Sequence, residues 1–121
     1  NKDQVDYINF HGTSTIVNDK VETLAVKNLF NSLSQKIPVS STKSMIGHPQ
    51  GASGALGVTV SLLSLYNNFL TPTINQESPD PECDLDYTPN IGREKKLSIA
   101  ISNCISFGSK NSALVLGKFS K

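Results

Sequence analysis

Hydrophobic and polar positions follow two different periods along the chain. Residues 5–10 carry the apolar and aromatic side chains of a strand, and Gly12 supplies the turn after it. Beyond that turn, helical spacing predicts one buried face, made of Val21, Leu24, Ala25, Leu29 and Leu33. Asp19 is the predicted N-cap of this helix, and Glu22, three residues later, completes a capping box.

The next stretch predicts a second strand and a second helix. Residues 37–40 have the composition of a short strand, and residues 41–51 form a turn rich in glycine and hydroxyl side chains. Residues 52–67 predict a helix that is apolar nearly all round and begins with small residues. Such a helix is expected to lie closely buried against other elements.

The last part of the chain predicts a loop and two strands. Residues 73–90 are rich in proline and acidic side chains, which is typical of a long surface loop. Residues 96–102 and 112–119 predict strands joined by a turn around Gly108. A βαβα order followed by two strands indicates an α/β fold in three layers.

Composition narrows the class of protein. The 121 residues suffice for one domain with a modest core, and 37% hydrophobic and 17% charged content excludes a disordered chain. The longest apolar stretch, residues 52–66, is too short to cross a bilayer. The net charge is only +1 and the lysines are scattered, so the sequence gives no electrostatic support for nucleic-acid binding. Cys83 and Cys104 make no disulfide framework, and without a signal pattern we expect a reducing, cytosol-like compartment.

Two histidines and a lysine lie in turns where ring side chains are unusual. His11 precedes a Gly-Thr-Ser-Thr run, and His48 follows 37 residues later, behind Lys43 in a Ser-Thr-Lys-Ser run. A neutral imidazole N–H can stabilise the negative charge on a carbonyl oxygen when the adjacent carbon becomes an enolate. The charge of Lys43 lowers the pKa of a neighbouring histidine and keeps that ring neutral. The set predicts a site for an oxyanion or carboxylate, without an obvious nucleophile.

Other interpretations of these residues have less support. Both histidines could simply cap their turns, and this alternative stays open. The two histidines and two cysteines could ligate zinc, but they lack the short paired spacings of zinc sites. Residues 40–43 fit Ser-x-x-Lys without its companion motifs, and residues 108–110 lack the upstream glycine of a phosphate-binding loop.

Several segments together resemble the β-ketoacyl-acyl carrier protein synthases. The resemblance runs through nearly the whole chain in the expected order, and it is strongest to elongating type II synthases and polyketide ketosynthase domains. The segments that carry it are residues 5–15, 40–48, 51–55, 72–75, 84–89 and 103–111. The resemblance implies the C-terminal half of a thiolase-like fold with α-β-α-β-α layers, with residues 1–121 forming a partial C-terminal ketoacyl synthase domain.

The resemblance also implies roles for the two histidine turns. His11 and His48 would donate hydrogen bonds to the malonyl thioester carbonyl and stabilise the enolate formed as carbon dioxide leaves. Lys43 would organise His48 and the charge around it. The implied activity is the decarboxylative Claisen condensation of acyl and malonyl carrier-protein thioesters in fatty-acid or polyketide synthesis. No cofactor and no metal ion is implied.

Further substrate contacts follow from the same resemblance. Thr13 and Thr15 would hydrogen-bond the pantetheine arm of the carrier protein. Phe107 would be an aromatic gate beside the acyl pocket. Glu22 matches an acidic position of the family near the site, although its capping box is sufficient to explain it.

The gating turn departs from the family pattern. Ser106 and Ser109 replace glycines, and Lys110 replaces a threonine. A serine is strained wherever the turn needs a positive φ. Ile105 and Phe10 also differ from the residues usual in the family. These departures bear on the mobility of the gate and on the substrate range, and less on the roles of the two histidines.

The family's nucleophilic cysteine belongs to an N-terminal half that this sequence does not contain, and Cys83 and Cys104 are predicted to be structural. The expected partners are that N-terminal half, an acyl carrier protein bearing phosphopantetheine thioesters, and a second copy in a full-length homodimer. No nucleic acid or membrane partner is expected. The expected location is the cytoplasm, or a plastid or mitochondrial matrix. The alternative function is a non-catalytic ketosynthase-like partner that controls chain length or docks carrier protein.

Overall fold

Four strands form a mixed sheet at the centre of the chain, whose residues 1–119 are described by the computed structural model. Across the sheet the order is β2 (Val39–Ser40), β1 (Tyr7–Asn9), β5 (Ile99–Cys104) and β6 (Ser112–Gly117). Strand β1 is parallel to both neighbours, and β6 closes the sheet antiparallel to β5. These strands confirm the four that the sequence predicts, with ends shifted by a few residues.

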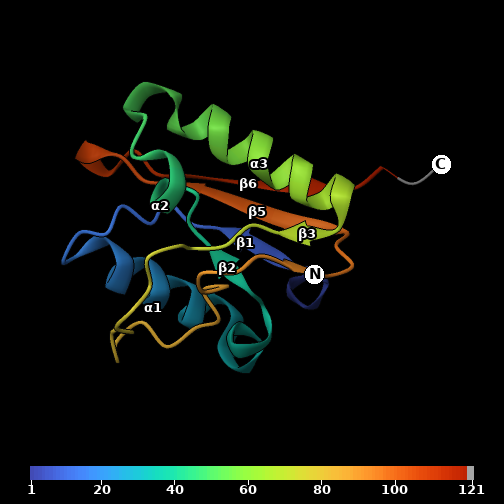
Figure 1. Ribbon diagram of the computed structural model, residues 1–121, viewed down its shortest axis with the longest axis horizontal. Helices are drawn as coiled ribbons and strands as arrows, with labels where there is room; N and C mark the ends of the chain where they lie inside the picture. The colour runs from blue at the N-terminus through green and yellow to red at the C-terminus, as the bar shows by residue number, and fades with distance from the viewer. Residues whose placement is uncertain (120–121) are drawn as a thin grey trace.

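Two helices cover opposite faces of this sheet (Figure 1). Helix α1 (Asn18–Phe30) connects β1 to β2, and helix α3 (Ser53–Asn67) lies in the connection from β2 to β5. The two connections run in opposite directions across the sheet, because β2 and β5 flank β1 on different sides. Right-handed crossovers in opposite directions place their helices on opposite faces. The predicted three-layer α/β arrangement is confirmed.

The core has two parts, one on each face of the sheet. Successive side chains of β1 point to opposite faces, so Ile8 belongs to one cluster and Tyr7 to the other. The cluster under α1 consists of Ile8, Phe10, Val26, Phe30, Ile37, Val39 and Leu85. The cluster under α3 consists of Tyr7, Leu65, Leu70, Leu97 and Ala100.

Helix α1 begins without the predicted cap. It starts at Asn18 behind Val17, which has helical dihedral angles and makes no side-chain cap. Asp19 lies inside the first turn, where its carboxylate accepts the N–H of Ser14 at 3.1 Å. Thr15 Oγ1 accepts the N–H of Asn18 at 3.1 Å and so satisfies a free donor of the first turn. The predicted Asp19 cap is wrong, because a threonine of the preceding turn takes that role.

The buried face of α1 also differs from the predicted one. Its buried side chains are Glu22, Thr23, Val26 and Phe30. The predicted face is largely outside, with Val21, Leu24 and Leu29 exposed by 54%, 56% and 49%. The apolar spacing is therefore real, but it marks a face that nothing in the described chain covers.

Helix α3 is confirmed, but only one of its faces is buried. The buried positions are Ser53, Gly57, Ser61, Ser64 and Leu65. Gly57 lets the helix approach the sheet, since a Cβ there would lie 2.8 Å from Ser102 Oγ. Leu62, Leu63 and Tyr66 on the other side are exposed. The expected close burial against other elements is confirmed on the sheet-facing side, and the opposite apolar side is uncovered in residues 1–119.

The remaining elements are short. Helix α2 (Lys43–Ile46) follows β2, and strands β3 (Phe69–Leu70) and β4 (Arg93–Glu94) form a separate antiparallel pair that the sequence did not predict. Four 3₁₀ segments complete the described elements: Lys2–Gln4, Asn31–Lys36, Gln50–Ala52 and Phe107–Ser109. The predicted loop over residues 73–90 is confirmed as irregular chain, although it contributes Leu85 to the core.

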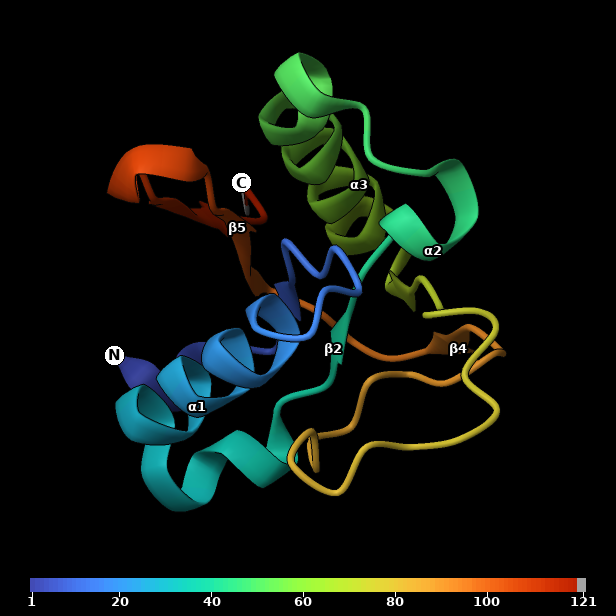
Figure 2. The same cartoon turned by 90° about the vertical axis from the view of Figure 1, so that its left-hand side faces the viewer.

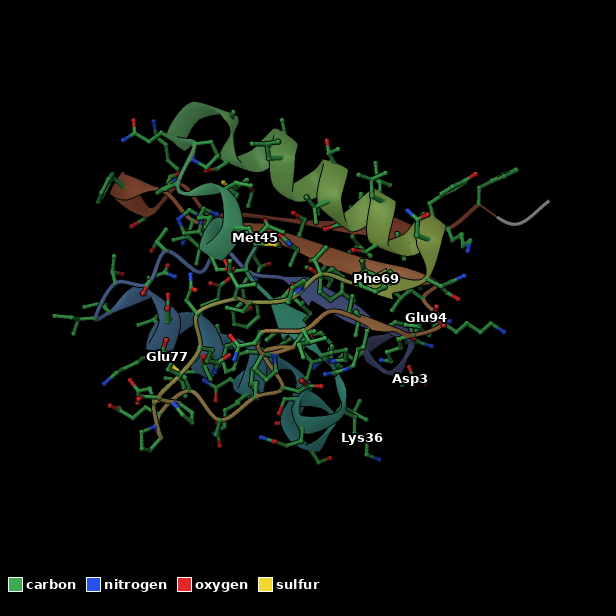
Figure 3. The ribbon with its side chains drawn as sticks, viewed as in Figure 1. Asp3, Lys36, Met45, Phe69, Glu77 and Glu94 are labelled. Carbon is green, nitrogen blue, oxygen red and sulfur yellow. The ribbon has the colours of Figure 1, made fainter. Side chains whose placement is uncertain are left out.

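Charged side chains are spread over the periphery. In Figure 3 the labelled Asp3, Lys36, Glu77 and Glu94 lie at the edges of the molecule, and all four are exposed. None of the helices in residues 1–119 is long and apolar enough to span a membrane.

Candidate functional site

The two histidine turns meet at one end of the sheet. The first turn leaves the carboxyl end of β1 for α1, and the second leaves the carboxyl end of neighbouring β2 for α3 on the opposite face, as the end-on view of Figure 2 shows. Adjacent parallel strands whose connections leave in opposite directions open a crevice at their carboxyl ends. The topology therefore explains why residues 37 positions apart in the sequence come together.

The structure brings His11 and His48 into direct ring contact. Their ring centroids lie 5.3 Å apart, with the planes at 85°. His11 is only 6% exposed. Burial, the charge of Lys43 and the proximity of His48 lower its pKa from 6.5 to about 4, and Asp19 opposes this shift. His11 is therefore a neutral imidazole near pH 7, as the sequence analysis expects for a site of this kind.

Hydrogen bonds determine the tautomer of His48. Its Nδ1 accepts the backbone N–H of Gln50 at 3.1 Å, and the Oγ of Ser53 lies 3.0 Å from the same nitrogen. A backbone N–H can only donate, so Nδ1 must carry a lone pair. The neutral ring then holds its proton on Nε2, where it is a hydrogen-bond donor. His11 differs, since within residues 1–119 its buried Nδ1 has no partner.

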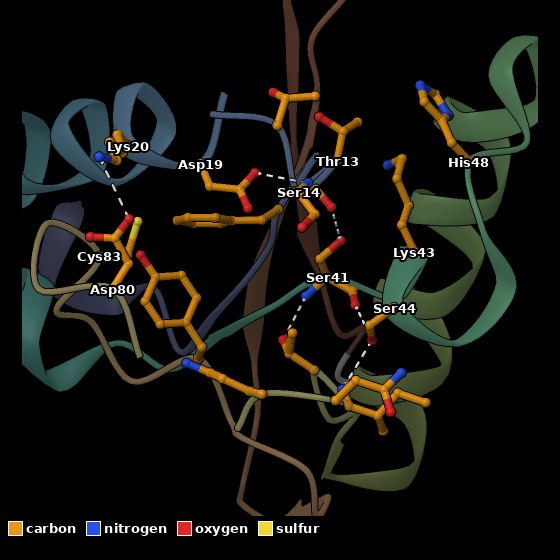
Figure 4. Close-up of a pocket in the computed structure, with 18 of the residues that line it drawn as sticks. Thr13, Ser14, Asp19, Lys20, Ser41, Lys43, Ser44, His48, Asp80 and Cys83 are labelled. Carbon is orange, nitrogen blue, oxygen red and sulfur yellow. Dashed lines mark hydrogen bonds and ion pairs between the residues drawn. The ribbon is translucent and has the colours of Figure 1, made fainter. Parts of the chain in front are cut away.

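Lys43 lies between the two turns. It is the first residue of α2, so the expectation of a simple turn at this position is corrected to a one-turn helix. Burial lowers its pKa, while the acidic groups of Cys104 and Glu22 act in the opposite direction. Its positive charge is the second largest cause of the lowered pKa of His11. Figure 4 shows the Lys43 side chain extending toward Thr13, below His48.

A buried carboxylate fixes the first histidine turn. Glu22 is 2% exposed, and its two oxygens accept the N–H groups of His11 at 2.8 Å and Gly12 at 3.0 Å. The side-chain amides of Asn103 and Asn18 donate to the same carboxylate at 3.1 and 3.4 Å. Burial raises the pKa of Glu22, and these four donors oppose the shift. The predicted capping box is wrong, because Glu22 holds the turn of His11 and Gly12 instead of its own helix.

Ser41 links the two turns directly. Its Oγ donates to the carbonyl oxygen of Gly12 at 2.8 Å, and its N–H donates to Thr73 Oγ1 at 3.1 Å. Gly12 has a φ of +44°, and a Cβ there would overlap the Ser41 side chain. This close approach explains the glycine after His11.

A cavity of about 850 Å³ opens beside the turns. Thr13, Thr15, Lys43 and His48 are among its lining residues, and so are loop residues 74–78, Asp80, Cys83 and Tyr87. In Figure 4, Lys43 and His48 lie across the pocket from Asp80 and Cys83. His11 is not among the lining residues. The arrangement offers hydroxyl groups, a cation and an imidazole N–H to one ligand.

Phe107 is not brought to this cavity. Its ring is fully exposed at the turn between β5 and β6 and is not among the lining residues. In the same turn Gly108 and Ser109 have φ values of +74° and +61°. The left-handed conformation is costly for a serine, so the strain expected from the Ser-for-Gly replacement falls on Ser109. Ser106, with a φ of −130°, is unstrained.

The two cysteines are free and half-buried. Cys104 is the last residue of β5, and Cys83 lies in the loop that lines the cavity. Neither lies at the start of a helix, where a thiol pKa would be lowered. Across residues 1–119, no three or more His, Cys, Asp or Glu side chains gather as a metal site.

Sequence comparison gives consistent matches. A family model described as "Beta-ketoacyl synthase, C-terminal domain" matches residues 1–77. The chain is 49% identical over 116 residues to 3-oxoacyl-[acyl-carrier-protein] synthase 2 of Coxiella burnetii, covering 96% of this chain and 28% of that protein. It is 43% identical over 114 residues to Nodulation protein E of Rhizobium sp. (strain N33), covering 94% and 28%. The chain thus spans less than a third of the length of these relatives.

Structural comparison agrees. A type II PKS ketosynthase, solved in complex with its acyl-carrier protein and bound to the hexaketide, superposes with a TM-score of 0.97 at 35% identity, covering 99% of this chain and 29% of that one. The ishigamide ketosynthase/chain length factor gives 0.95 at 35% identity, covering 99% and 29%. A beta-ketoacyl synthase from Burkholderia phymatum STM815 gives 0.91 at 33% identity, covering 98% and 29%. The expected thiolase-like ketosynthase fold is thereby confirmed.

Proposed function

This chain belongs to the β-ketoacyl synthases, as part of their C-terminal domain, and from that premise we propose that it supplies the decarboxylation site of a β-ketoacyl-acyl carrier protein synthase. The substrates would be acyl and malonyl thioesters of carrier protein, condensed in fatty-acid or polyketide synthesis. The observation that carries this proposal is the pair of histidines, one held neutral by burial and one holding its proton on Nε2.

The proposed chemistry follows from these two rings. The malonyl thioester oxygen would accept the N–H of His48 and that of His11, whose ring centroids are 5.3 Å apart. When the bond to the carboxylate carbon breaks, carbon dioxide leaves and the electron pair stays on the α-carbon. That pair delocalises onto the thioester oxygen, where two N–H donors stabilise the negative charge. The carbanion then attacks an acyl thioester, which expels the thiolate that carried the acyl group.

Lys43 and the threonines would support the substrate. After burial, the positive charge of Lys43 is the largest cause of the lowered pKa of His11, and this charge can attract the malonyl carboxylate. Thr13 and Thr15 line the same cavity, where their hydroxyls would hydrogen-bond a pantetheine arm. A solved relative is a ketosynthase in complex with its acyl-carrier protein, which supports an acyl carrier protein as the partner here.

The acyl-accepting thiol would come from outside this chain. Cys104 ends a strand and Cys83 lies in a loop, so neither has the helix start that activates a thiol. We propose that the N-terminal part carried by the relatives supplies it, and that the complete protein is a homodimer. No cofactor enters the proposed reaction, and the free cysteines fit a reducing compartment such as the cytoplasm.

Alanine replacement of each histidine tests the proposal. His11→Ala and His48→Ala should each lower malonyl-acyl carrier protein decarboxylation by about 100-fold or more in the natural polypeptide that carries this chain. Carbon dioxide release is the measurement. Lys36→Ala, an exposed lysine far from the cavity, is the matched control. Unchanged carbon dioxide release in both histidine variants would contradict the proposed function.

The second candidate is a non-catalytic ketosynthase-like partner. It is favoured by the altered gating turn, in which Ser109 is strained and Phe107 lies away from the cavity. One solved relative is a ketosynthase/chain length factor. In this case the histidine variants would change the length of the product and leave decarboxylation intact.

A further inference from the structure

We propose that Ser53 is a positioning residue that holds the imidazole of His48 in the orientation needed for its role. The inference rests on the proposed function of His48, and it adds a residue that the sequence analysis did not single out. Ser53 touches the ring and not the substrate, so its effect would pass entirely through His48.

The contact is direct and buried. Ser53 Oγ lies 3.0 Å from His48 Nδ1, and the serine is 7% exposed. Because the N–H of Gln50 already donates to Nδ1, that nitrogen is an acceptor, and the Ser53 hydroxyl must donate to it as well. The Gln50 N–H thus leaves the ring proton on Nε2, and the Ser53 hydroxyl adds a second hydrogen bond that holds Nδ1 in place.

The two donors differ in how firmly they are held. Gln50 belongs to the same exposed turn as His48, and it has an unfavourable φ of +41°. A donor on that turn moves together with the ring. Ser53 is instead the first residue of α3, a fifteen-residue helix packed against the sheet. The hydroxyl therefore ties an exposed histidine to a rigid element.

The direction of the ring follows from the same geometry. The hydrogen bond from the Ser53 hydroxyl restricts rotation of the imidazole about its Cβ–Cγ bond. In Figure 4, His48 extends from the segment that leads into α3 and stands above Lys43. With Nδ1 bound on the helix side, Nε2–H is left for a ligand. The Gln50 N–H thus sets the tautomer, and the Ser53 hydroxyl keeps the ring in the orientation that serves the site.

The test compares Ser53→Ala with Ser61→Ala in the natural polypeptide that carries this chain. Ser61 is a matched control, since it lies on the same buried face of α3 and its Oγ donates to the Gly57 carbonyl at 2.8 Å. The probe is the ¹⁵N spectrum of the His48 ring, in which the Nδ1 resonance reports hydrogen bonds to that nitrogen without any substrate. Loss of the Ser53 hydrogen bond should shift the Nδ1 resonance toward that of an unbonded nitrogen in Ser53→Ala, and Ser61→Ala should leave it unchanged.

A third variant, Ser53→Thr, keeps the hydroxyl and should keep the original ¹⁵N pattern. Steady-state kinetics give a second measurement, in which Ser53→Ala lowers the turnover number for decarboxylation about fivefold while KM is unchanged. An unaltered ¹⁵N pattern in folded Ser53→Ala, or an altered one in folded Ser53→Thr, would overturn the proposal. The spectrum needs no activity, so it separates failure of this inference from failure of the proposed function, which the His48→Ala rate decides.

Discussion

At the scale of single residues, the site uses two histidines in contrasting environments. His11 is buried, and desolvation is the largest cause of its lowered pKa. His48 is exposed, and donors at Nδ1 fix its tautomer. Two side chains position the turn that carries His11. Glu22 accepts hydrogen bonds from the N–H groups of this turn, and Ser41 donates one to its carbonyl oxygen. A small number of buried polar groups therefore decides both the position and the charge of the rings.

The low pKa of His11 predicts a specific dependence of stability on pH. Its pKa is about 4 when folded, against 6.5 in the unfolded chain. Between these two pH values the unfolded state binds more protons than the folded state. The contribution of His11 to the free energy of unfolding is therefore fully present above pH 6.5, and it is lost as the pH drops toward 4. The full loss from this ring is about 3 kcal/mol. NMR titration of His11 should give a midpoint near its folded pKa, well below that of an exposed histidine.

His11→Asn is the control, because it removes the titrating ring. Denaturant unfolding at pH 7 and at pH 4.5 should show a smaller difference for this variant than for the unchanged protein. Glu22 affects the pH dependence with the opposite sign. Its pKa is raised in the folded protein, so its contribution to the free energy of unfolding falls as the pH rises through that folded pKa. It is present in both proteins and cancels in the comparison. Equal pH dependence in both would contradict a buried neutral His11.

Gly12 and Gly47 give a second prediction at this scale. Both have a positive φ, +44° and +74°, but a Cβ at Gly12 would overlap Ser41, whereas a Cβ at Gly47 would meet nothing within 4 Å. Gly47 combines this φ with a ψ of −172°, a region essentially limited to glycine, so Gly47→Ala should lower the free energy of unfolding by about 2 kcal/mol through backbone strain alone. Gly12→Ala adds a steric clash and should cost about 3 kcal/mol. Urea unfolding measures both, and equal losses would show that the turns are free to separate.

Sequence patterns located the histidines but not the groups that hold them. His11, Lys43 and His48 stand out because glycines and hydroxyl side chains surround them. The contacts of Glu22 with the His11 turn and with Asn103 span 11 and 81 positions. Hydrogen bonds over such separations leave no local pattern, and an acidic residue near a helix start is equally well explained by a capping box.

At the scale of elements, the helices show what hydrophobic spacing can and cannot predict. Period and length identified α1 and α3 correctly, but the apolar face of α1 is outside and serines and glycine occupy the buried face of α3. Packing selects the face that fits against the sheet, and small residues allow the closest approach. The strongest hydrophobic face is therefore left for a neighbour that these residues do not include. The short pair β3–β4 was missed because β3 follows α3 after a single residue and β4 consists of two charged residues, so neither shows an apolar strand pattern.

Two glycines of α3 provide a test of this close approach. Gly54 and Gly57 are one turn apart, and replacing glycine by alanine inside a helix gains about 1 kcal/mol in helix propensity. At Gly54 the new Cβ would lie 3.9 Å from Cys104 Sγ, an ordinary contact. Gly54→Ala should therefore stabilise the protein. At Gly57 the Cβ would lie 2.8 Å from Ser102 Oγ, so Gly57→Ala should destabilise it despite the same propensity gain. Thermal unfolding of both variants measures the difference, and a gain for Gly57→Ala would contradict the packing.

At the scale of the whole molecule, the loop over residues 73–90 closes the cavity against α1. Lys20 pairs with Asp80 and Glu82, and Lys27 pairs with Asp84 at 2.8 Å. These lysines and acidic side chains are each more than a third exposed, so the pairs are weakened by salt. Part of the attachment of this loop to α1 therefore depends on ionic strength, whereas the hydrogen-bonded pairing of the sheet strands does not.

High salt should loosen this wall selectively. Amide hydrogen exchange over residues 75–86 should become faster between low salt and 1 M NaCl, by about tenfold or less. Exchange in β1 and β5 should stay unchanged, because backbone ladders buried in the sheet hold them. Lys27→Ala should reproduce part of the effect at low salt, and Lys36→Ala, which forms none of these pairs, is the control. Uniform acceleration over the whole chain would show that the loop and the sheet open together.

The exposed apolar faces bear on the state of the chain as a whole. Leu62 and Leu63 of α3 are 46% and 55% exposed, Val21 and Leu24 of α1 slightly more than half, and Val115 of β6 is 68% exposed. Apolar surface of this extent is rarely left open to water in a monomer. Because the chain spans less than a third of its relatives' length, the remainder of such a protein would be expected to cover these faces. The 121 residues alone are therefore predicted to self-associate.

Sedimentation velocity over a concentration series tests this prediction. The chain alone should sediment as oligomers whose size grows with concentration, and Leu62→Glu with Leu63→Glu should shift it toward monomer. Thr59→Glu places one such charge at an exposed polar position of the same helix, so it is the charge-matched control for Leu63→Glu alone. A monomer at every concentration would mean that these leucines are not a contact surface. If Thr59→Glu alone matched the double variant, charge repulsion and not loss of the apolar face would explain the dissociation.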